Sequence, residues 1–384
     1  MAPDFKEVSV SNQRVALVVS SLSAGGAERV ISTMANYWAK KNWEITFITF
    51  DSYKTDFYPL DSRVKRKALN LVNDSHNLFM ALLSNFRRIR TIRKALKETT
   101  PDTVISFVDT TNVLTLLSCI GLKINRTIVS ERVDPSVHPL PSTWRFLRRI
   151  SYPLADRVVV QTDSIQKWAR KFLPEKKIAI IANPVCSSND VQCHSDNDLS
   201  PLFGKRDSKF LVGMGRLTHQ KGFDILIRAF ANISERHPEW KLVIFGEGTE
   251  RAALHQLISR TGMSERVVLP GTTATPGYFL KQADLFVLPS RYEGFPNTLL
   301  EAMMAGLPVI SFDCPSGPAE IIRTGVDGVL VPAGDSHALT SEIEKLMESK
   351  DKRERLAARA PEVIERFGLD QIMTLWEKLI TNEV

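Results

Sequence analysis

The stretch Ala283–Ile310, ADLFVLPSRYEGFPNTLLEAMMAGLPVI, decides the fold of this chain. It opens with a strand-like apolar run, Asp284–Ser290, and passes through a Gly-Phe-Pro-Asn turn into apolar residues at helical spacing. A second short apolar run, Pro308–Ser311, follows directly. A strand, a helix and another strand in this order predict a βαβ unit, in which the two strands are parallel.

The same pattern recurs along both halves of the chain. Short runs rich in β-branched residues alternate with segments of helical periodicity. The runs are apolar without alternation, which is typical of parallel strands covered by helices on both faces. The expected strands are Arg14–Ser20, Ile45–Phe50, Thr103–Val108, Arg126–Ser130, Arg157–Gln161 and Ile178–Ala182, then Phe210–Gly215, Lys241–Gly246, Arg266–Pro270, Asp284–Ser290, Pro308–Ser311 and Val329–Pro332. The sequence therefore predicts an α/β protein of two doubly wound, Rossmann-like domains facing a cleft.

The domain boundaries follow from length and composition. A chain of 384 residues exceeds one ordinary domain. After Ala182 comes the pair Asn183-Pro184, and the sequence then becomes polar and loses its periodicity. We expect a first domain over residues 1–184, a linker over 185–208 and a second domain over 209–368. An amphipathic helix in 369–384 lies beyond the last strand, where it can cross back to the first domain.

Composition favours a globular protein of the reducing cytoplasm. The chain is 43% apolar and 24% charged. No apolar run approaches the roughly 18 residues that a membrane span needs, and the first residues do not form a secretory signal. The four cysteines lack the spacing of a disulfide framework or a metal site. We interpret Asp196-Asn197-Asp198, together with nearby Cys193 and His194, as linker residues and expect no metal site.

The charge is unevenly distributed. Residues 1–190 contain 28 Lys and Arg against 17 Asp and Glu, a net charge of +11, whereas the remainder carries −4. Two runs, FRRIRTIRKALK (Phe86–Lys97) and WRFLRRISY (Trp144–Tyr152), interleave basic and apolar residues at helical spacing. Such runs indicate either solvated helix faces or contact with an anionic membrane surface or a polyanionic acceptor. No nucleic-acid-binding motif accompanies them, so we expect no nucleic-acid partner.

Ligands of open α/β sheets bind beyond the carboxyl ends of the strands, so the residues after each strand matter most. Gly25-Gly26 follows the first strand and precedes a helical stripe, which lets backbone approach a ligand, although a tight turn explains it equally well. Arg216 and Lys221 follow the first strand of the second half, and Gly222 opens the next helix. Two cations in this place suit a diphosphate, the alternative being ordinary surface charge.

The quoted stretch carries two carboxylates with different surroundings. Glu293 lies in the loop at the carboxyl end of a strand, and Glu301 lies about one turn into the helix for which we expect Asn297 to be the N-cap. A carboxylate accepts hydrogen bonds from adjacent hydroxyls, as on a ribose or hexose, and the helix start offers N–H groups to an anion. Sugars flanking a diphosphate describe a nucleotide sugar.

These motifs together resemble a known family. Gly25-Gly26, Arg216-x4-Lys221-Gly222 and Glu293-x7-Glu301 resemble the retaining glycosyltransferases of the GT-B fold, the large glycogen-synthase-like family 4. The quoted stretch looks like the most diagnostic block of that family, and SGPAEIIRTGVDGVLVPAGD matches its usual continuation. SAGGAERV and CPSGPAEII are similar to bacterial members that build lipid-linked glycans and surface polysaccharides.

The resemblance implies a role for each matching residue. Arg216 and Lys221 would hold the donor diphosphate, Glu301 the ribose hydroxyls and Glu293 the transferred sugar, so that Glu293, Arg216 and Lys221 carry catalysis. The other expected donor contacts are Gly25, Gly26, Thr272, Gly294, Phe295, Pro296, Asn297 and Thr298. Many family members place a donor-sugar histidine after the strand matching Arg126–Ser130, where this chain has Glu131-Arg132 and, further on, His138. These three become candidates for acceptor or donor-sugar contact. Arg132 suits a phosphate-bearing acceptor such as a polyprenyl diphosphate, or it pairs with Glu131 or Asp134 as structure.

The expected activity is transfer of a hexose or N-acetylhexosamine from a UDP-linked donor to a lipid-linked or growing glycan. It would take place at the inner face of the cytoplasmic membrane, without a metal or further cofactor. Double displacement through Glu293 and front-face substitution both stay open, the resemblance favouring the latter. The alternatives are a sugar-nucleotide epimerase or a phosphorylase on the same fold, or a non-catalytic basic protein that binds membrane or nucleic acid.

Overall fold

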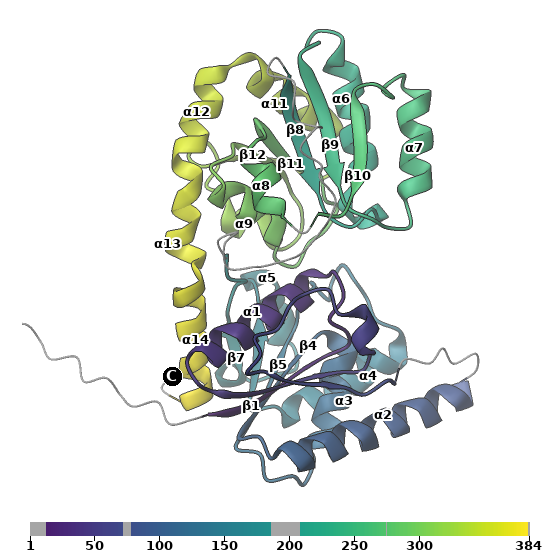
Figure 1. The fold of residues 1–384 in the computed structure, drawn as a ribbon, viewed down its shortest axis with the longest axis vertical. Coiled ribbons are helices and arrows are strands. Elements are labelled where there is room, and N and C mark those ends of the chain that lie inside the picture. Colours follow the sequence, from purple (N-terminus) through teal and green to yellow (C-terminus); the bar gives the residue numbers. More distant parts are fainter. Residues whose placement is uncertain (1–12, 72–77, 186–207, 274, 383–384) are drawn as a thin grey trace, which may run out of the picture.

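The computed structural model of the protein describes residues 13–71, 78–185, 208–273 and 275–382. They form two α/β units, one above the other in Figure 1, with a run of helices along one side of both. The expected linker lies almost wholly outside the described residues, and Cys193, His194 and Asp196–Asp198 lie there too.

Each unit contains one parallel sheet. The first has seven strands in the order β3-β2-β1-β4-β5-β6-β7, and the second has six in the order β10-β9-β8-β11-β12-β13. The strands of the first sheet are β1 (Arg14–Val19), β2 (Glu44–Thr49), β3 (Lys65–Ala68), β4 (Thr103–Phe107), β5 (Arg126–Ser130), β6 (Arg157–Val160) and β7 (Ile178–Ile180). Those of the second are β8 (Lys209–Met214), β9 (Trp240–Phe245), β10 (Val267–Gly271), β11 (Leu285–Leu288), β12 (Val309–Asp313) and β13 (Val329–Pro332). The strand order reverses between β1 and β4 and between β8 and β11, so both units are doubly wound, as predicted.

Helices cover both faces of each sheet (Figure 1). In the first unit they are α1 (Gly26–Lys40), α2 (Leu78–Thr99), α3 (Asp109–Cys119), α4 (Ser142–Ser151) and α5 (Asp163–Ala169). The second unit has α6 (Phe223–Ser234), α7 (Arg251–Arg260), α8 (Pro276–Leu280), α9 (Asn297–Met304), α10 (Pro318–Ile321), α11 (Ser336–Glu348), α12 (Lys350–Arg359) and α13 (Val363–Phe367). The continuous apolar runs of the central strands are buried because helices pack on both sides.

All twelve expected strands are present, and the sequence missed one. The missed strand, β3, reads KRKA and pairs only with β2, at the edge of the first sheet. An edge strand is covered less than a central one, and charged side chains on it discourage pairing with other chains. Its sequence therefore lacks the apolar run that revealed the others.

The last helix, α14 (Leu369–Thr381), packs in the first unit although it follows the second in sequence. Its apolar side chains lie in the core of the first unit, and the Trp376 ring stacks on Phe107 with centroids 5.9 Å apart. Lys41 pairs with Glu377 at 2.8 Å. The buried members of this face are Ile372, Met373, Trp376, Leu379 and Ile380.

The chain crosses between the units at two points that lie side by side. Val185, at the exit of the first unit, forms a parallel bridge with Gly368, where the chain returns. The Val185 amide donates to the Phe367 carbonyl at 2.7 Å. In the parts of the chain that are described, no helix combines the length and hydrophobicity required to span a bilayer.

Candidate active site

The carboxyl ends of the two sheets face each other, and the loops after β1, β8 and β11 meet there. Each of these strands flanks the point where its sheet reverses strand order, which is where open α/β sheets bind ligands. Three groups of residues that are expected to bind the donor follow these strands. The group that starts at Gly25 comes after β1, the one that starts at Arg216 after β8, and the one that starts at Glu293 after β11.

Glu293 and Lys221 form a buried ion pair within the second unit. The Lys221 ammonium donates to Glu293 Oε1 at 2.6 Å, and the Ser290 hydroxyl donates to the same oxygen at 2.6 Å. Glu293 is 5% exposed. Lys221 was expected to bind the donor diphosphate and Glu293 the transferred sugar. In the structure these two side chains pair with each other.

A glycine directs the Lys221 turn. Gly222 has a φ of +66°, and a Cβ there would lie 2.0 Å from the Pro289 carbonyl oxygen. Only glycine fits this left-handed position against the end of the neighbouring strand. Gly222 then opens α6, so Lys221 is held between the ends of β8 and β11.

Arg216 is exposed and follows β8, and its charge influences a carboxylate of the first unit. Its charge, like that of Arg132, acts on the Glu28 carboxylate of α1. Burial raises the pKa of Glu28, and these cations and the Ser21 hydroxyl act in the opposite direction. Positive charge from the second unit is therefore directed at the start of α1.

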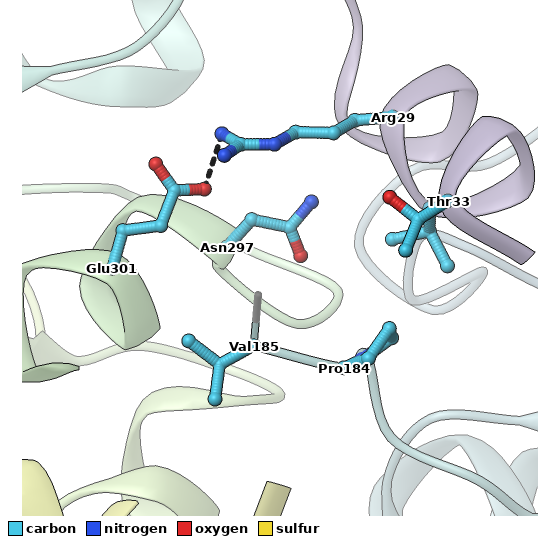
Figure 2. Close-up of a pocket in the computed structure, with 7 residues that line it drawn as sticks. Arg29, Thr33, Pro184, Val185, Asn297 and Glu301 are labelled. Atoms are coloured by element: carbon cyan, nitrogen blue, oxygen red, sulfur yellow. Dashed lines mark ion pairs between the residues drawn. The ribbon is translucent and has the colours of Figure 1, made fainter. Parts of the chain in front are cut away.

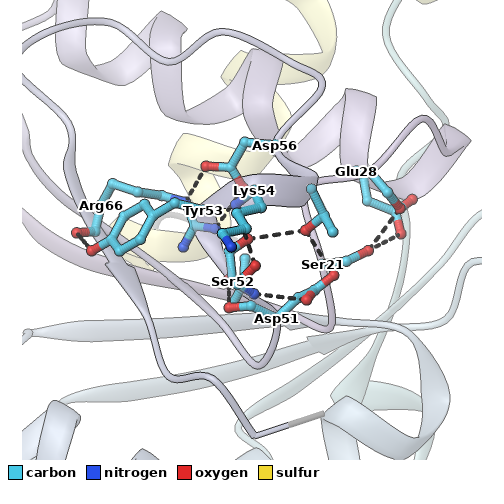
Figure 3. Close-up of polar contacts among 11 residues, drawn as sticks. Ser21, Glu28, Asp51, Ser52, Tyr53, Lys54, Asp56 and Arg66 are labelled. Carbon is cyan, nitrogen blue, oxygen red and sulfur yellow. Dashed lines mark hydrogen bonds and ion pairs between the residues drawn. The ribbon is translucent and has the colours of Figure 1, made fainter.

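The Glu28 side chain, in the first turn of α1, lies over the start of that helix. Figure 3 shows Glu28 with its carboxylate beside Ser21, which donates to it at 3.3 Å. A Cβ on Gly25 would lie 2.1 Å from Glu28 Oε2, so a side chain at this position would displace that carboxylate. Gly26 faces the other unit, since its Cβ would lie 3.4 Å from the Asn297 amide nitrogen.

The EGFPN loop (Glu293–Asn297) leads into α9 and lies against the first unit. A Cβ on Gly294 would lie 2.4 Å from the Arg132 carbonyl oxygen and 2.9 Å from Gln161 Oε1. Glycine is therefore required here by the approach of two units, independently of any ligand. The Phe295 ring is buried against Phe367, so only its backbone is available for the donor contact that was expected.

Asn297 contacts the first unit and does not cap its own helix. Helix α9 begins at Asn297, and Pro296 occupies the N-cap position without a side-chain hydrogen bond. The Asn297 amide donates to the Gly26 carbonyl at 3.1 Å and accepts from Asn183 at 2.5 Å. Asn183 also donates to the Phe295 carbonyl at 3.0 Å. The expectation that Asn297 is an N-cap was wrong, because Asn183 and Gly26 engage its side chain. Thr298 follows, with a buried hydroxyl that has no hydrogen-bond partner among the described residues.

Glu301 lies at the interface of the units and is 6% exposed. One of its oxygens forms an ion pair with Arg29 of α1, and the other, Oε2, has no hydrogen-bond partner in the part of the chain that the structure describes. Figure 2 shows these two side chains meeting across a small pocket. Its lining residues come from both units and are Arg29, Val30, Thr33, Pro184, Val185, Asn297 and Glu301.

The remaining expected site residues lie apart from this pocket. Thr272 is exposed just after β10. His138 of the first unit stacks on Tyr292 of the second, with ring centroids 6.4 Å apart. His138 thus lies across the interface from the residue that precedes Glu293.

Glu131 and Arg132 are buried side by side but have different partners. The Glu131 carboxylate accepts from the Tyr152 hydroxyl at 2.5 Å and from Arg148 at 3.2 Å. Arg132 donates to Ser130 and Asn183 and lies over the Phe107 ring, 4.2 Å from its centroid. Burial lowers the pKa of Arg132 to about 9. Pairing of Arg132 with Glu131 was therefore wrong, since Arg148 is the cation that holds Glu131.

The sequence did not identify Arg29, Asn183, Gln161 or Arg148 as site residues. Arg29 stands three residues after Gly26 inside the expected helix, and Asn183 belongs to the Asn-Pro pair that indicated the domain boundary. Each makes its contact with a group distant in sequence, so local pattern gives no signal for it.

One group of three side chains within the described residues has the geometry to hold a metal ion. It consists of His237, Glu344 and Glu348. His237 precedes β9, and the two glutamates lie late in α11. The group is therefore at the amino ends of the strands, whereas the interface is at their carboxyl ends.

The buried Glu131 gives stability a testable pH dependence. Burial raises the pKa of Glu131 to about 7, although Arg148 and Tyr152 act in the opposite direction. The folded protein therefore binds this proton more tightly than the unfolded chain, and the associated stability is present below pH 4.5 and is lost as the pH rises toward 7. Glu131→Gln removes the titration, so its free energy of unfolding should improve relative to the wild type between pH 5 and pH 8. Urea denaturation at four pH values measures this difference, and a pH-independent difference would contradict it.

Comparison with known families covers most of the chain. Residues 24–188 match the profile of Glycosyltransferase Family 4, and residues 197–363 match that of Glycosyl transferases group 1. The two matches correspond to the two units, and together they include every site residue that the sequence predicted, from Gly25 to Glu301. Both profiles describe glycosyltransferases.

Curated relatives span nearly the whole length. A Campylobacter jejuni protein is 30% identical over 370 residues, which is 96% of this chain and 98% of that protein. It is named GalNAc-alpha-(1->4)-GalNAc-alpha-(1->3)-diNAcBac-PP-undecaprenol alpha-1,4-N-acetyl-D-galactosaminyltransferase. The amylovoran biosynthesis glycosyltransferase AmsD of Erwinia amylovora is 28% identical over 372 residues, 96% of this chain and 99% of AmsD.

Solved structures share the fold at low sequence identity. HepE of Anabaena, in complex with UDP, superposes with a TM-score of 0.76 at 19% identity, over 96% of this chain and all of HepE. Sucrose-phosphate synthase of Thermosynechococcus elongatus gives a TM-score of 0.80 at 16% identity, over 96% of this chain and 99% of that one. With the full-length relatives and both family profiles, these results identify the chain as a member of glycosyltransferase family 4, a glycosyltransferase with the GT-B fold.

Proposed function

We propose that this glycosyltransferase transfers a hexose or N-acetylhexosamine from a UDP-sugar to a lipid-linked or growing glycan, with retention of configuration. The observation that carries the proposal is the arrangement of Lys221, Glu293 and Glu301 beside the interface of the two units. In this arrangement Glu293 would bind the sugar end of a nucleotide sugar and Glu301 the nucleoside end. Lys221 would lie near the diphosphate between them.

The donor would bind along the loop between the two carboxylates. Arg216 and Lys221 would hold the diphosphate, and Arg216, which is exposed, can turn toward it. The amides at the start of α9 would add hydrogen bonds to the distal phosphate. Positive charge fixed in this position stabilises the nucleoside diphosphate as it leaves, which is where transition-state charge develops.

Glu293 would position the sugar without attacking it. Its Oε1 accepts from Lys221 and Ser290, which holds the carboxylate in place, and it would then accept hydrogen bonds from hydroxyls of the transferred sugar. In the proposed front-face substitution the C1–O bond to the phosphate breaks, and the acceptor oxygen bonds C1 from the same face. The acceptor proton passes to the leaving phosphate oxygen, so no protein nucleophile is required.

Relatives support the choice of substrates. The Campylobacter jejuni relative is named for a diphospho-undecaprenol glycan, and HepE was solved with UDP. A polyprenyl diphosphate acceptor would bring its phosphates to the first unit, where Arg132 lies close to the interface with the EGFPN loop. We therefore propose a UDP-sugar as donor and a lipid-linked glycan as acceptor, with no metal required.

A membrane-facing surface would serve such an acceptor. Helix α4 exposes Phe146 (64%) and Ile150 (50%) with Arg145 and Arg149 beside them. Arg148 of the same run is buried against Glu131, so it does not belong to this surface. Exposed aromatic and aliphatic side chains flanked by arginines are typical of helices that lie in the membrane interface. We propose that this face binds the anionic inner leaflet of the cytoplasmic membrane.

Reversing two of these charges tests the surface. Arg145→Glu with Arg149→Glu should weaken binding to anionic liposomes by about tenfold or more, because each basic residue near the surface contributes on the order of 1 kcal/mol. Cosedimentation with vesicles containing phosphatidylglycerol measures the partition. Lys350→Glu with Lys352→Glu on α12 changes the net charge equally at another exposed place and should leave binding unchanged. Equal binding by both double variants would contradict the proposed surface.

The donor and acceptor are identified by a panel assay. The protein is incubated with UDP-, GDP- and ADP-linked hexoses and N-acetylhexosamines and a labelled polyprenyl diphosphate glycan, and products are read by mass. We expect one sugar to be added from a UDP-linked donor. Interconversion of free sugar nucleotides without transfer would instead identify an epimerase, and no conversion of any donor or acceptor would contradict the proposed substrates.

A further inference from the structure

Glu301 is held in an unusual way for a buried carboxylate. It is 6% exposed, yet within the described residues only one of its two oxygens has a partner, the Arg29 guanidinium. Leaving a buried charged oxygen without a hydrogen bond is costly unless a ligand or water completes the site. Its burial and its missing partner point to a ligand that donates a hydrogen bond at Oε2.

Arg29 reaches Glu301 from the other unit. It lies in the first turns of α1, which begins at Gly26, and its side chain is 19% exposed. Asn297 and Asn183 hold the start of α9 against the first unit at the same place. The ion pair therefore joins the two units and depends on how closely they approach each other.

We propose that Arg29 is a positioning residue for the nucleoside end of the donor. It holds Oε1 of Glu301 and presents Oε2 to a ribose hydroxyl, so that the first unit completes the nucleoside subsite of the second. The inference rests on the proposed function, in which Glu301 binds the ribose. It adds that nucleoside recognition depends on the approach of the two units, because the carboxylate and its orienting cation belong to different ones.

A competing arrangement predicts the opposite sign. If the ribose needed both oxygens of Glu301, it would displace Arg29, and removing Arg29 would strengthen nucleotide binding. If Arg29 orients the carboxylate, removing it weakens binding. The sign of the change in dissociation constant therefore distinguishes the two arrangements.

Calorimetric titration of the full-length protein with UDP provides the test, with GDP and ADP in parallel. Arg29→Ala should raise the Kd for the preferred nucleotide by about tenfold or more, because a hydrogen bond to a charged group is lost. Arg29→Lys should recover part of the affinity. Lys40→Ala, an exposed lysine at the far end of α1, is the matched control and should bind as the wild type does.

Two further probes place the effect at the ribose. Inorganic pyrophosphate lacks a nucleoside, so its Kd should be the same for Arg29→Ala and the wild type, which also verifies that the variant is folded. The affinity penalty for 2′-deoxy-UDP or 3′-deoxy-UDP relative to UDP should shrink in Arg29→Ala, since the carboxylate is no longer oriented.

The outcomes separate this inference from the proposed function. If Glu301→Gln leaves the affinity for all three nucleotides unchanged, the ribose role of Glu301 fails and the inference fails with it. If Glu301→Gln weakens binding but Arg29→Ala does not, the positioning role is overturned while the donor site stands. Tighter binding by Arg29→Ala overturns the positioning role as well and identifies Arg29 as a competitor of the ribose.

Discussion

Replacing Lys221 by alanine is expected to reduce kcat by at least about a hundredfold. In the proposed site this ammonium lies between Glu293 and the donor diphosphate, where it stabilises the charge that develops on the leaving phosphate. The structure shows it 2.6 Å from Glu293 and largely buried, which strengthens its electrostatic effect. Steady-state transfer with saturating donor and acceptor measures kcat, and thermal unfolding shows whether the variant is folded at the assay temperature.

Stability must be followed in the same variant. Removing one partner of a buried pair leaves the other charge uncompensated, so Lys221→Ala should also lower the melting temperature. Lys345→Ala removes an exposed lysine paired with Glu342 on α11 and should change neither kcat nor stability appreciably. A folded Lys221→Ala protein whose kcat stays within about threefold of the wild type would contradict the assignment of Lys221 to the donor diphosphate.

Gly294→Ala should also reduce kcat by about a hundredfold, for a different reason. Its new Cβ would lie 2.4 Å from the Arg132 carbonyl oxygen, so the two units could not approach as closely as they do. Groups from both units must meet around the donor, and misplacement by about 1 Å is sufficient for a loss of this size. The variant should show the kcat loss in the transfer assay and a larger radius of gyration in small-angle scattering.

A second glycine provides the control. Gly306→Ala places a Cβ in open space but at a φ of +82°, so it should lower the melting temperature without separating the units. If Gly294→Ala kept wild-type activity, the contact between the EGFPN loop and the first unit would not belong to the catalytic arrangement.

The sequence predicts the architecture well because its signals are local. Each central strand is a continuous apolar run, since helices bury it on both faces, and all twelve such runs became strands. The strand that was missed, β3, lies at an edge and carries three basic residues in KRKA. Motif positions after β1, β8 and β11 were also readable, because the carboxyl ends of parallel strands lie at one edge of a sheet.

Contacts between the units were not predictable in the same way. The pairing of Arg29 with Glu301, and of Asn183 with Asn297, joins residues more than a hundred positions apart. One sequence contains no record of which charged residue on a helix meets which partner in another unit. Gly294 illustrates the difficulty, since it was expected as a donor contact and nothing in the sequence indicated that two first-unit oxygens lie against it.

Charge runs were ambiguous for a related reason. WRFLRRISY has helical spacing, but spacing alone does not separate Arg148, which is buried against Glu131, from Arg145 and Arg149, which are exposed. A basic residue on the inner face of a helix requires a buried acid, and Glu131 was considered as a ligand contact or as a partner of Arg132, not of Arg148. The helix periodicity was therefore right while the assignment of one arginine was wrong.

The measurement that tests the central claim most directly is the mass balance of a single transfer reaction. Wild-type protein and Lys221→Ala are incubated with the UDP-sugar and a labelled polyprenyl diphosphate glycan, and the elongated glycan, released UDP and free sugar are quantified together. For the wild type we predict one elongated glycan per UDP released and little free sugar, and for Lys221→Ala a loss of at least about a hundredfold in both products. UDP release without an elongated glycan, or equal rates for the two proteins, would contradict the account.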